Sequence, residues 1–174
     1  MIDKHLIVFQ IVLPMLTAPL CVLVRTRRMA VGLTIAVCWA TFALATRLLY
    51  RVIENGPISY EIGGWPAPWG IEYYVDALSS FVVWFVAGIG AIVISYAPPS
   101  LNREIPLTRH YLFCAMYLLC LTGLLGIAIT GDLFNLFVFL EISSLSSYAL
   151  IAQGTTRLAL TSSLQYLVMG TIGG

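Results

Sequence analysis

Long runs of apolar residues, separated by short polar segments, dominate the chain. Five of them are long enough to cross a hydrocarbon core of roughly 30 Å as helices; they span residues 5–24, 30–50, 76–97, 109–130 and 132–153. A sixth run, 160–174, covers only about 22 Å at 1.5 Å per residue, so we expect an incomplete last helix in a truncated chain. The pattern predicts an all-α fold, a polytopic transmembrane bundle of about six helices forming a single membrane domain, 1–174.

The segment between the second and third runs carries a different pattern. Two short runs rich in β-prone residues, 58–62 and 71–75, flank the Gly- and Pro-rich segment 63–70. This arrangement predicts a small β-hairpin, which we expect on the extracytoplasmic side. Four aromatic side chains of this region suit the interfacial belt, where a ring meets both water and lipid: Trp65, Trp69, Tyr73 and Tyr74.

The amino-acid composition also indicates a protein whose surface is in contact with lipid. Of the 174 residues, 60% are hydrophobic and 10% are charged, with a mean hydropathy of +0.93, whereas a soluble domain has about 45–50% apolar and about 25% charged residues. No basic run suits nucleic acid. The four cysteines fall inside apolar runs without the paired spacing of a metal site, so we expect small hydrophobic side chains, no metal and no cofactor: Cys21, Cys38, Cys114 and Cys120.

Basic residues are distributed unevenly between the two sets of loops. The loops after the first, third and fifth runs hold six arginines and one acid: Arg25, Arg27, Arg28, Arg103, Arg109, Arg157 and Glu104. The opposite set holds three basic and six acidic residues: Lys4, Arg47, Arg51, Asp3, Glu54, Glu61, Glu72, Asp76 and Asp132. Because cytoplasmic loops carry the excess of Lys and Arg, the N-terminus is predicted to lie outside.

Glu141 is the one acidic or basic residue that falls near the middle of a predicted membrane helix. It lies roughly 13 Å from the start of the fifth run. An ionised carboxylate at the bilayer centre costs about 3 kcal/mol on insertion scales, so we expect this buried group to be neutralised by a proton or paired with a cation. Either state makes Glu141 a candidate for proton translocation. The alternative is a protonated side chain that only hydrogen-bonds between helices.

Two hydroxyl side chains extend the polar face of this helix. At 100° per residue, Ser144 lies about 60° from Glu141 and Tyr148 about 20°. Both are weaker candidates for a proton relay. Small residues also permit close helix packing, and that interpretation applies equally to the four serines of this helix: Ser143, Ser144, Ser146 and Ser147.

Asp132 follows Gly131, which breaks the preceding helix. Its carboxylate stands where an N-cap belongs and can accept from the free amides of the fifth helix. We predict a helix cap, with a proton exit as the alternative.

The stretch from Gly131 to Glu141, GDLFNLFVFLE, resembles the fifth-helix signature of the antiporter-like membrane subunits of Mrp-type cation/proton antiporters, complex I and membrane-bound hydrogenases. The segments 63–71, 76–79 and 165–173 are similar to other parts of this family, and the chain looks most like the D-type member of the Mrp antiporters. The resemblance implies that Glu141 pairs with a lysine on a seventh helix, within a fold of about fourteen helices. Gln165 departs from the lysine of many members and weakens any sixth-helix proton role.

Three functions follow from these observations. The first is a non-enzymatic subunit of a multisubunit monovalent cation (Na+)/proton antiporter in a bacterial or archaeal cell membrane, with the bilayer, protons and sister subunits as partners. The second is a proton-pumping subunit of a complex I-like NADH-quinone oxidoreductase or a membrane-bound hydrogenase, which neighbouring genes would distinguish from the first. The third is a non-transporting membrane scaffold, in which the glutamate only stabilises packing.

Overall fold

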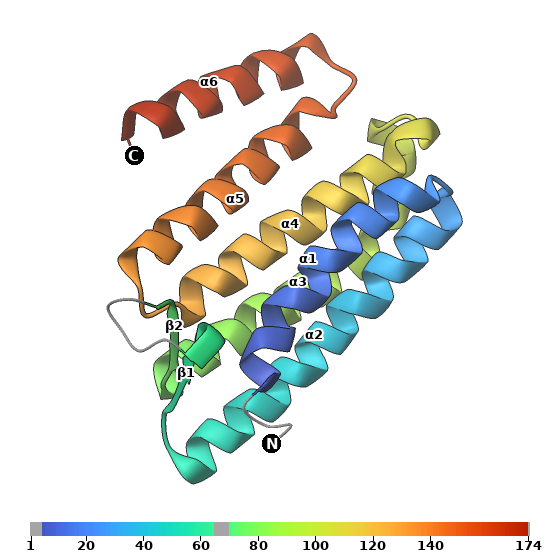
Figure 1. The fold of residues 1–174 in the computed structure, drawn as a ribbon. Helices are drawn as coiled ribbons and strands as arrows, with labels where there is room; N and C mark the ends of the chain where they lie inside the picture. Colours follow the sequence, from blue (N-terminus) through green and yellow to red (C-terminus); the bar gives the residue numbers. More distant parts are fainter. Residues whose placement is uncertain (1–4, 65–69, 174) are drawn as a thin grey trace.

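The structure is a computed structural model that describes residues 5–64 and 70–173 (Figure 1). Its helices are α1 (Leu6–Val24), α2 (Arg27–Asn55), α3 (Ala77–Glu104), α4 (His110–Ile129), α5 (Leu133–Ala152) and α6 (Arg157–Gly173), with short 3₁₀ turns at Ile62–Gly64 and Leu107–Arg109. Strands β1 (Ile58–Glu61) and β2 (Glu72–Val75) lie between α2 and α3. The predicted all-α bundle is confirmed. In the described residues α1 to α5 are long and apolar enough to cross a membrane.

α2 and α3 are longer than the apolar pattern predicts. They contain 29 and 28 residues, or about 42 Å of helix each, which exceeds a hydrocarbon core of roughly 30 Å. α3 continues through Pro98 and Pro99, where the predicted segment ends. Each proline removes one N–H donor, and a freed carbonyl near the membrane surface has water available, unlike one in the hydrocarbon core.

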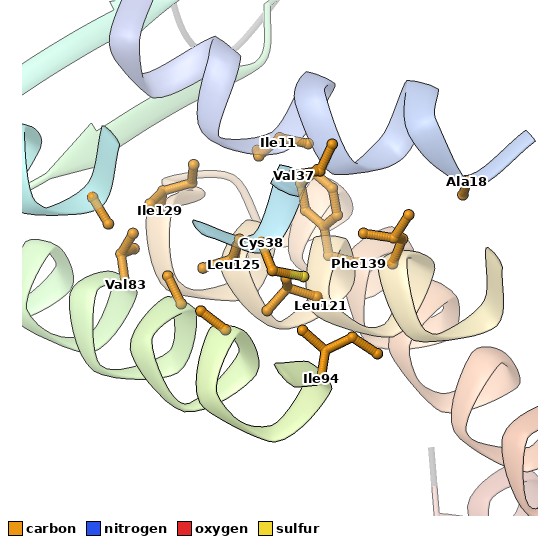
Figure 2. Packing of buried hydrophobic residues seen from close by; sticks show 14 of the residues in the cluster. Ile11, Ala18, Val37, Cys38, Val83, Ile94, Leu121, Leu125, Ile129 and Phe139 are labelled. Atoms are coloured by element: carbon orange, nitrogen blue, oxygen red, sulfur yellow. The ribbon is translucent and has the colours of Figure 1, made fainter. Parts of the chain in front are cut away.

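α4 lies at the centre of the packing and contacts α1, α2, α3 and α5. Its Leu121, Leu125 and Ile129 belong to one buried apolar cluster together with Val83 and Ile94 of α3 (Figure 2). Half of the residues in the apolar stretch of Leu107–Ile129, which includes α4, are buried, compared with 22% for α5. α6 packs beside α5 at the edge of the bundle (Figure 1). Packing therefore becomes looser from α4 outward to α6.

Two glycines of α4 allow α5 to approach closely. A Cβ atom added at Gly123 would lie 2.6 Å from the Cβ of Ser143, and one added at Gly126 would overlap the ring of Phe139. Small residues at such crossings let helix backbones come together in a bilayer, where van der Waals contact and hydrogen bonds drive association. The α4–α5 crossing thus depends on the absence of two side chains.

The predicted hairpin is present, with β1 antiparallel to β2 and Ile58 opposite Val75. It packs on the turn between α4 and α5, because the Gly131 N–H donates to the Glu72 carbonyl over 2.9 Å. Tyr73 forms a β-bridge with Thr130; its burial raises the pKa of the phenol, and a hydrogen bond with Asn135 offsets part of that rise. Trp65 and Trp69 of the predicted aromatic belt lie outside the described residues.

The two ends of the bundle differ in charge. The turns that join α1 to α2, α3 to α4 and α5 to α6 lie at one end, here called the arginine-rich end, and the hairpin lies at the other (Figure 1). The arginine-rich end is defined by Arg25, Arg27, Arg28, Arg103, Arg109 and Arg157. Its position on the cytoplasmic side, with the N-terminus outside, stays a prediction from the charge bias. Lys4 and Asp3, used in that prediction, lie outside the described residues.

Gly126→Ala is expected to destabilise the protein by about 1–3 kcal/mol, because the new methyl group overlaps the Phe139 ring and overpacks the α4–α5 crossing. Thermal unfolding in detergent micelles measures the effect. Gly32→Ala is the matched control, since a Cβ atom there meets nothing within 4 Å. Equal melting temperatures for the two variants would contradict the close crossing.

Candidate functional site

The start of α5 is fixed by Asp132 and its neighbours. The Asp132 carboxylate accepts a hydrogen bond from the Asn135 backbone N–H over 3.0 Å. The Asn135 side-chain amide in turn donates to the Thr130 hydroxyl over 3.1 Å. An aspartate at this position satisfies one of the free N–H groups and favourably meets the positive end of the helix dipole. Asp132 lies at the far end of α5 from Ser144 and Tyr148.

One face of α5 is buried against the bundle and the opposite face is not. Its buried residues recur every three or four positions and are Asn135, Phe139, Ser143 and Ser146. Glu141 follows Phe139 by two positions, about 160° around the helix, and its side chain is exposed. The expected burial of this carboxylate among the described helices is therefore not found. The physical reason is that the contact with α4 fixes the rotation of α5.

Glu141 lines an open groove of about 440 Å³ between α5 and α6, here called the α5–α6 groove. The lining consists of Phe137, Leu140, Glu141, Ser144, Leu145 and Tyr148 from α5 with Leu167, Gly170 and Thr171 from α6. The structure thus brings the carboxylate and both predicted hydroxyl groups of α5 into one cleft. Among the described residues no Lys, Arg or His lines it.

α6 contacts α5 around Tyr148, at one side of the groove. The rings of Tyr148 and Tyr166 meet edge to face with centroids 5.2 Å apart, and the Ser163 hydroxyl donates to the Tyr148 carbonyl over 2.8 Å. Gly170 leaves room for the phenol, because a Cβ atom there would collide with the Tyr148 hydroxyl. The position of this hydroxyl therefore depends on a glycine in the neighbouring helix.

Apart from the apolar lining, the groove contains two residues that the sequence analysis did not single out, Gly170 and Thr171. The Thr171 hydroxyl donates to the Leu167 carbonyl over 2.9 Å within α6, so only its lone pairs are open to the groove. Helix periodicity indicates that these residues lie together. Gly170 and Thr171 are three and four positions after Leu167 and therefore share its face of α6. Gln165 lies on another part of α6 and is exposed.

The four serines of α5 divide into two groups. Ser143 and Ser146 are buried toward α4 and donate to backbone carbonyls of α5. Ser147 donates to the Ser143 carbonyl and contacts the Cys120 thiol at 3.4 Å. Ser144 alone of the four lines the α5–α6 groove. Close packing thus accounts for Ser143, Ser146 and Ser147. Ser144 is the one serine of the four whose position in the groove suits a proton relay.

Three titratable groups outside the groove have local structural partners. His110 is buried, with Nε2 3.0 Å from the Ile105 carbonyl, and His5 contacts the Tyr60 hydroxyl at 3.1 Å. Asp76 caps α3, and hydrogen bonds from Ser79 lower the pKa of its carboxyl group. Among the described residues no three His, Cys, Asp or Glu side chains gather as metal ligands.

Known proteins resemble this chain in sequence and in fold, although no protein-family model matches it. The N subunit of NADH-quinone oxidoreductase from Desulforudis audaxviator is 43% identical over 141 residues, covering 80% of this chain and 28% of that protein. The D subunit of the Na(+)/H(+) antiporter from Bacillus subtilis is 30% identical over 170 residues, covering 97% and 34%. A chain of the membrane-bound sulfane sulfur reductase, an archaeal respiratory membrane complex, superposes with a TM-score of 0.89 at 27% identity, covering 97% and 34%.

The chain belongs to the family of antiporter-like membrane subunits. This agrees with the resemblance of the fifth-helix segment. The chain spans about a third of the length of these family members, and the matches extend over most of its own residues.

Asp132→Ala is expected to lower the free energy of unfolding by about 1 kcal/mol, because the first turn of α5 loses its cap. Asp132→Asn should keep most of the stability, since asparagine caps a helix about as well. Chemical or thermal unfolding in micelles distinguishes the two variants. An unchanged stability for Asp132→Ala would show that the cap contributes nothing to this family member.

Proposed function

We propose that this chain is a membrane subunit of a multisubunit Na+/proton antiporter and that Glu141 takes part in its proton path. The observation that carries the proposal is the shared cleft of Glu141, Ser144 and Tyr148. Family membership supports a transport role, because the relatives include D subunits of proteins named Na(+)/H(+) antiporter. The proposal concerns a complete membrane assembly, of which such a subunit is one part.

The depth of Glu141 supports a role that involves its charge. It is the ninth of the 20 residues of α5, roughly 12 Å from the start of the helix, and thus near the middle of a membrane span. A carboxylate there is costly in lipid and becomes tolerable when it is protonated, hydrated or paired. Because the α5–α6 groove is open, a neighbouring helix that carries a basic side chain has direct access to Glu141.

The chemistry of the groove supports proton transfer over simple packing. A glutamic acid that only stabilises helix packing needs a hydrogen-bond partner in a neighbouring helix. Among the described residues the Glu141 side chain has no such partner. The hydroxyls of Ser144 and Tyr148 are both donor and acceptor, so they suit a chain of groups and water along α5. The lysine that the resemblance implies on a seventh helix would supply the basic partner that makes a carboxylate tolerable at this depth.

A redox-driven pump is the second candidate, favoured by the 43% identity to the N subunit of NADH-quinone oxidoreductase. That match covers 80% of this chain, whereas the antiporter protein of Bacillus subtilis matches 97% of it. The antiporter interpretation therefore accounts for more of the chain. The same glutamate and groove serve either assembly. The neighbouring genes distinguish the two candidates, because genes for redox subunits are expected only beside the gene of a redox-driven pump.

Glu141→Gln is expected to abolish proton-coupled cation transport, a loss of about a hundredfold or more, because glutamine keeps the shape but cannot release a proton. The variant is made in the complete assembly, and transport is measured as cation-induced dissipation of a pH gradient in inverted membrane vesicles.

Ser147→Ala is the matched control on the packed side of α5, and it should leave transport close to wild type. Subunit assembly of both variants is checked by co-purification. Wild-type transport by a correctly assembled Glu141→Gln variant would overturn the role of Glu141.

A further inference from the structure

A second cleft lies at the arginine-rich end, far along the bundle from the hairpin. It has a volume of about 480 Å³ and is here called the α2 pocket. Its polar lining comes from Arg27 and Arg28 in the first turn of α2 and from His110 at the start of α4. The volume falls within the roughly 300–1,000 Å³ of small-ligand sites.

The α2 pocket is electropositive. Arg27 and Arg28 both line it, and none of its lining residues is an Asp or Glu. The Arg27 guanidinium donates to the Asn102 side-chain carbonyl of α3, which anchors that side chain across the two helices. A guanidinium has five N–H donors, so this one bond leaves further donors of Arg27 for an anion. Arg28 is exposed beside it.

The deeper wall of the same pocket is apolar. Val31 and Ile35 follow Arg27 by one and two turns of α2 and lead from the basic mouth toward the middle of the membrane span, and Pro98 of α3 also lines the cleft. Gly32 leaves open space along this wall, because a Cβ atom there would meet nothing within 4 Å. A free inorganic anion needs only the basic mouth. A ligand that uses the whole cleft has a negatively charged head and an apolar continuation.

We propose that the α2 pocket binds an anionic phospholipid, with its phosphate at Arg27 and Arg28 and an acyl chain along Val31 and Ile35. Arginine matches the geometry of phosphate oxygens through paired N–H donors. Basic pockets between membrane helices are suited to lipid headgroups. The site lies in a part of the bundle separate from the α5–α6 groove and does not depend on transport.

The proposal is tested by native mass spectrometry of the complete purified protein in micelles. It is titrated separately with dioctanoyl phosphatidylglycerol and with dioctanoyl phosphatidylcholine, and the phosphatidylglycerol complex is then mixed with inorganic phosphate. The wild type should bind one phosphatidylglycerol in preference to phosphatidylcholine, and the binding should weaken as salt rises. Complete displacement of the lipid by millimolar inorganic phosphate would overturn the lipid assignment in favour of a free-anion site.

Two variants probe the two halves of the pocket. Arg28→Gln should weaken phosphatidylglycerol binding about fivefold by removing one charge, whereas Arg157→Gln, outside the pocket, should not. Gly32→Phe should fill the wall and reduce binding to the phosphatidylcholine level, while Gly32→Ala should bind as the wild type does. Wild-type binding by both Arg28→Gln and Gly32→Phe, with unfolding temperatures unchanged, would overturn the proposal.

Discussion

The close crossing of α4 and α5 governs the geometry of the candidate site. In a bilayer the lipid tails are as apolar as the helix surfaces, so association depends on van der Waals fit and hydrogen bonds. Gly123 and Gly126 provide that fit by accepting Ser143 and Phe139 of α5 against the α4 backbone. Since helix side chains repeat every 3.6 residues, the same contact decides that Glu141 points to the opposite side. A rotation of α5 that buried Glu141 would place its carboxylate against the apolar centre of α4, at considerable energetic cost.

The hairpin strengthens this arrangement at one end of α5. Its strand β2 bonds to Gly131, and its Tyr73 forms a β-bridge with Thr130, just before α5. Together with the Asp132 cap, these contacts fix where α5 begins. The other side of α5 is bordered by α6, which meets it through Tyr148 and its aromatic and hydrogen-bond partners. The α5–α6 groove therefore lies at the boundary between the strongly packed and the weakly packed part of the bundle, where a further helix has access to the carboxylate.

The arginine-rich end and the groove place charge in the membrane in different ways. Arg27 and Arg28 stand near the end of a long helix, where side chains reach the interface at little cost. Glu141 stands near the middle of α5, where a carboxylate requires a proton, water or a partner. The first arrangement suits recognition of a lipid phosphate, and the second suits a group whose protonation changes during transport. Both follow from the depth of the charged group along its helix.

The sequence by itself determined the number and type of the helices, the hairpin, and the position of Glu141 near the middle of α5, because these depend on apolar run length, β-prone runs around turn residues and position in a helix. It predicted the Ser144–Tyr148 stripe from helical periodicity alone. It did not determine which way α5 faces, because that depends on Gly126 meeting Phe139 across two helices, and a single-helix pattern contains no information on the partner. The structure also showed that α3 continues through Pro98 and Pro99, where water near the membrane surface can bond to the freed carbonyls. For lack of the partner helix in the pattern, only the tertiary structure decided that Glu141 is exposed and that Gly170 accommodates Tyr148.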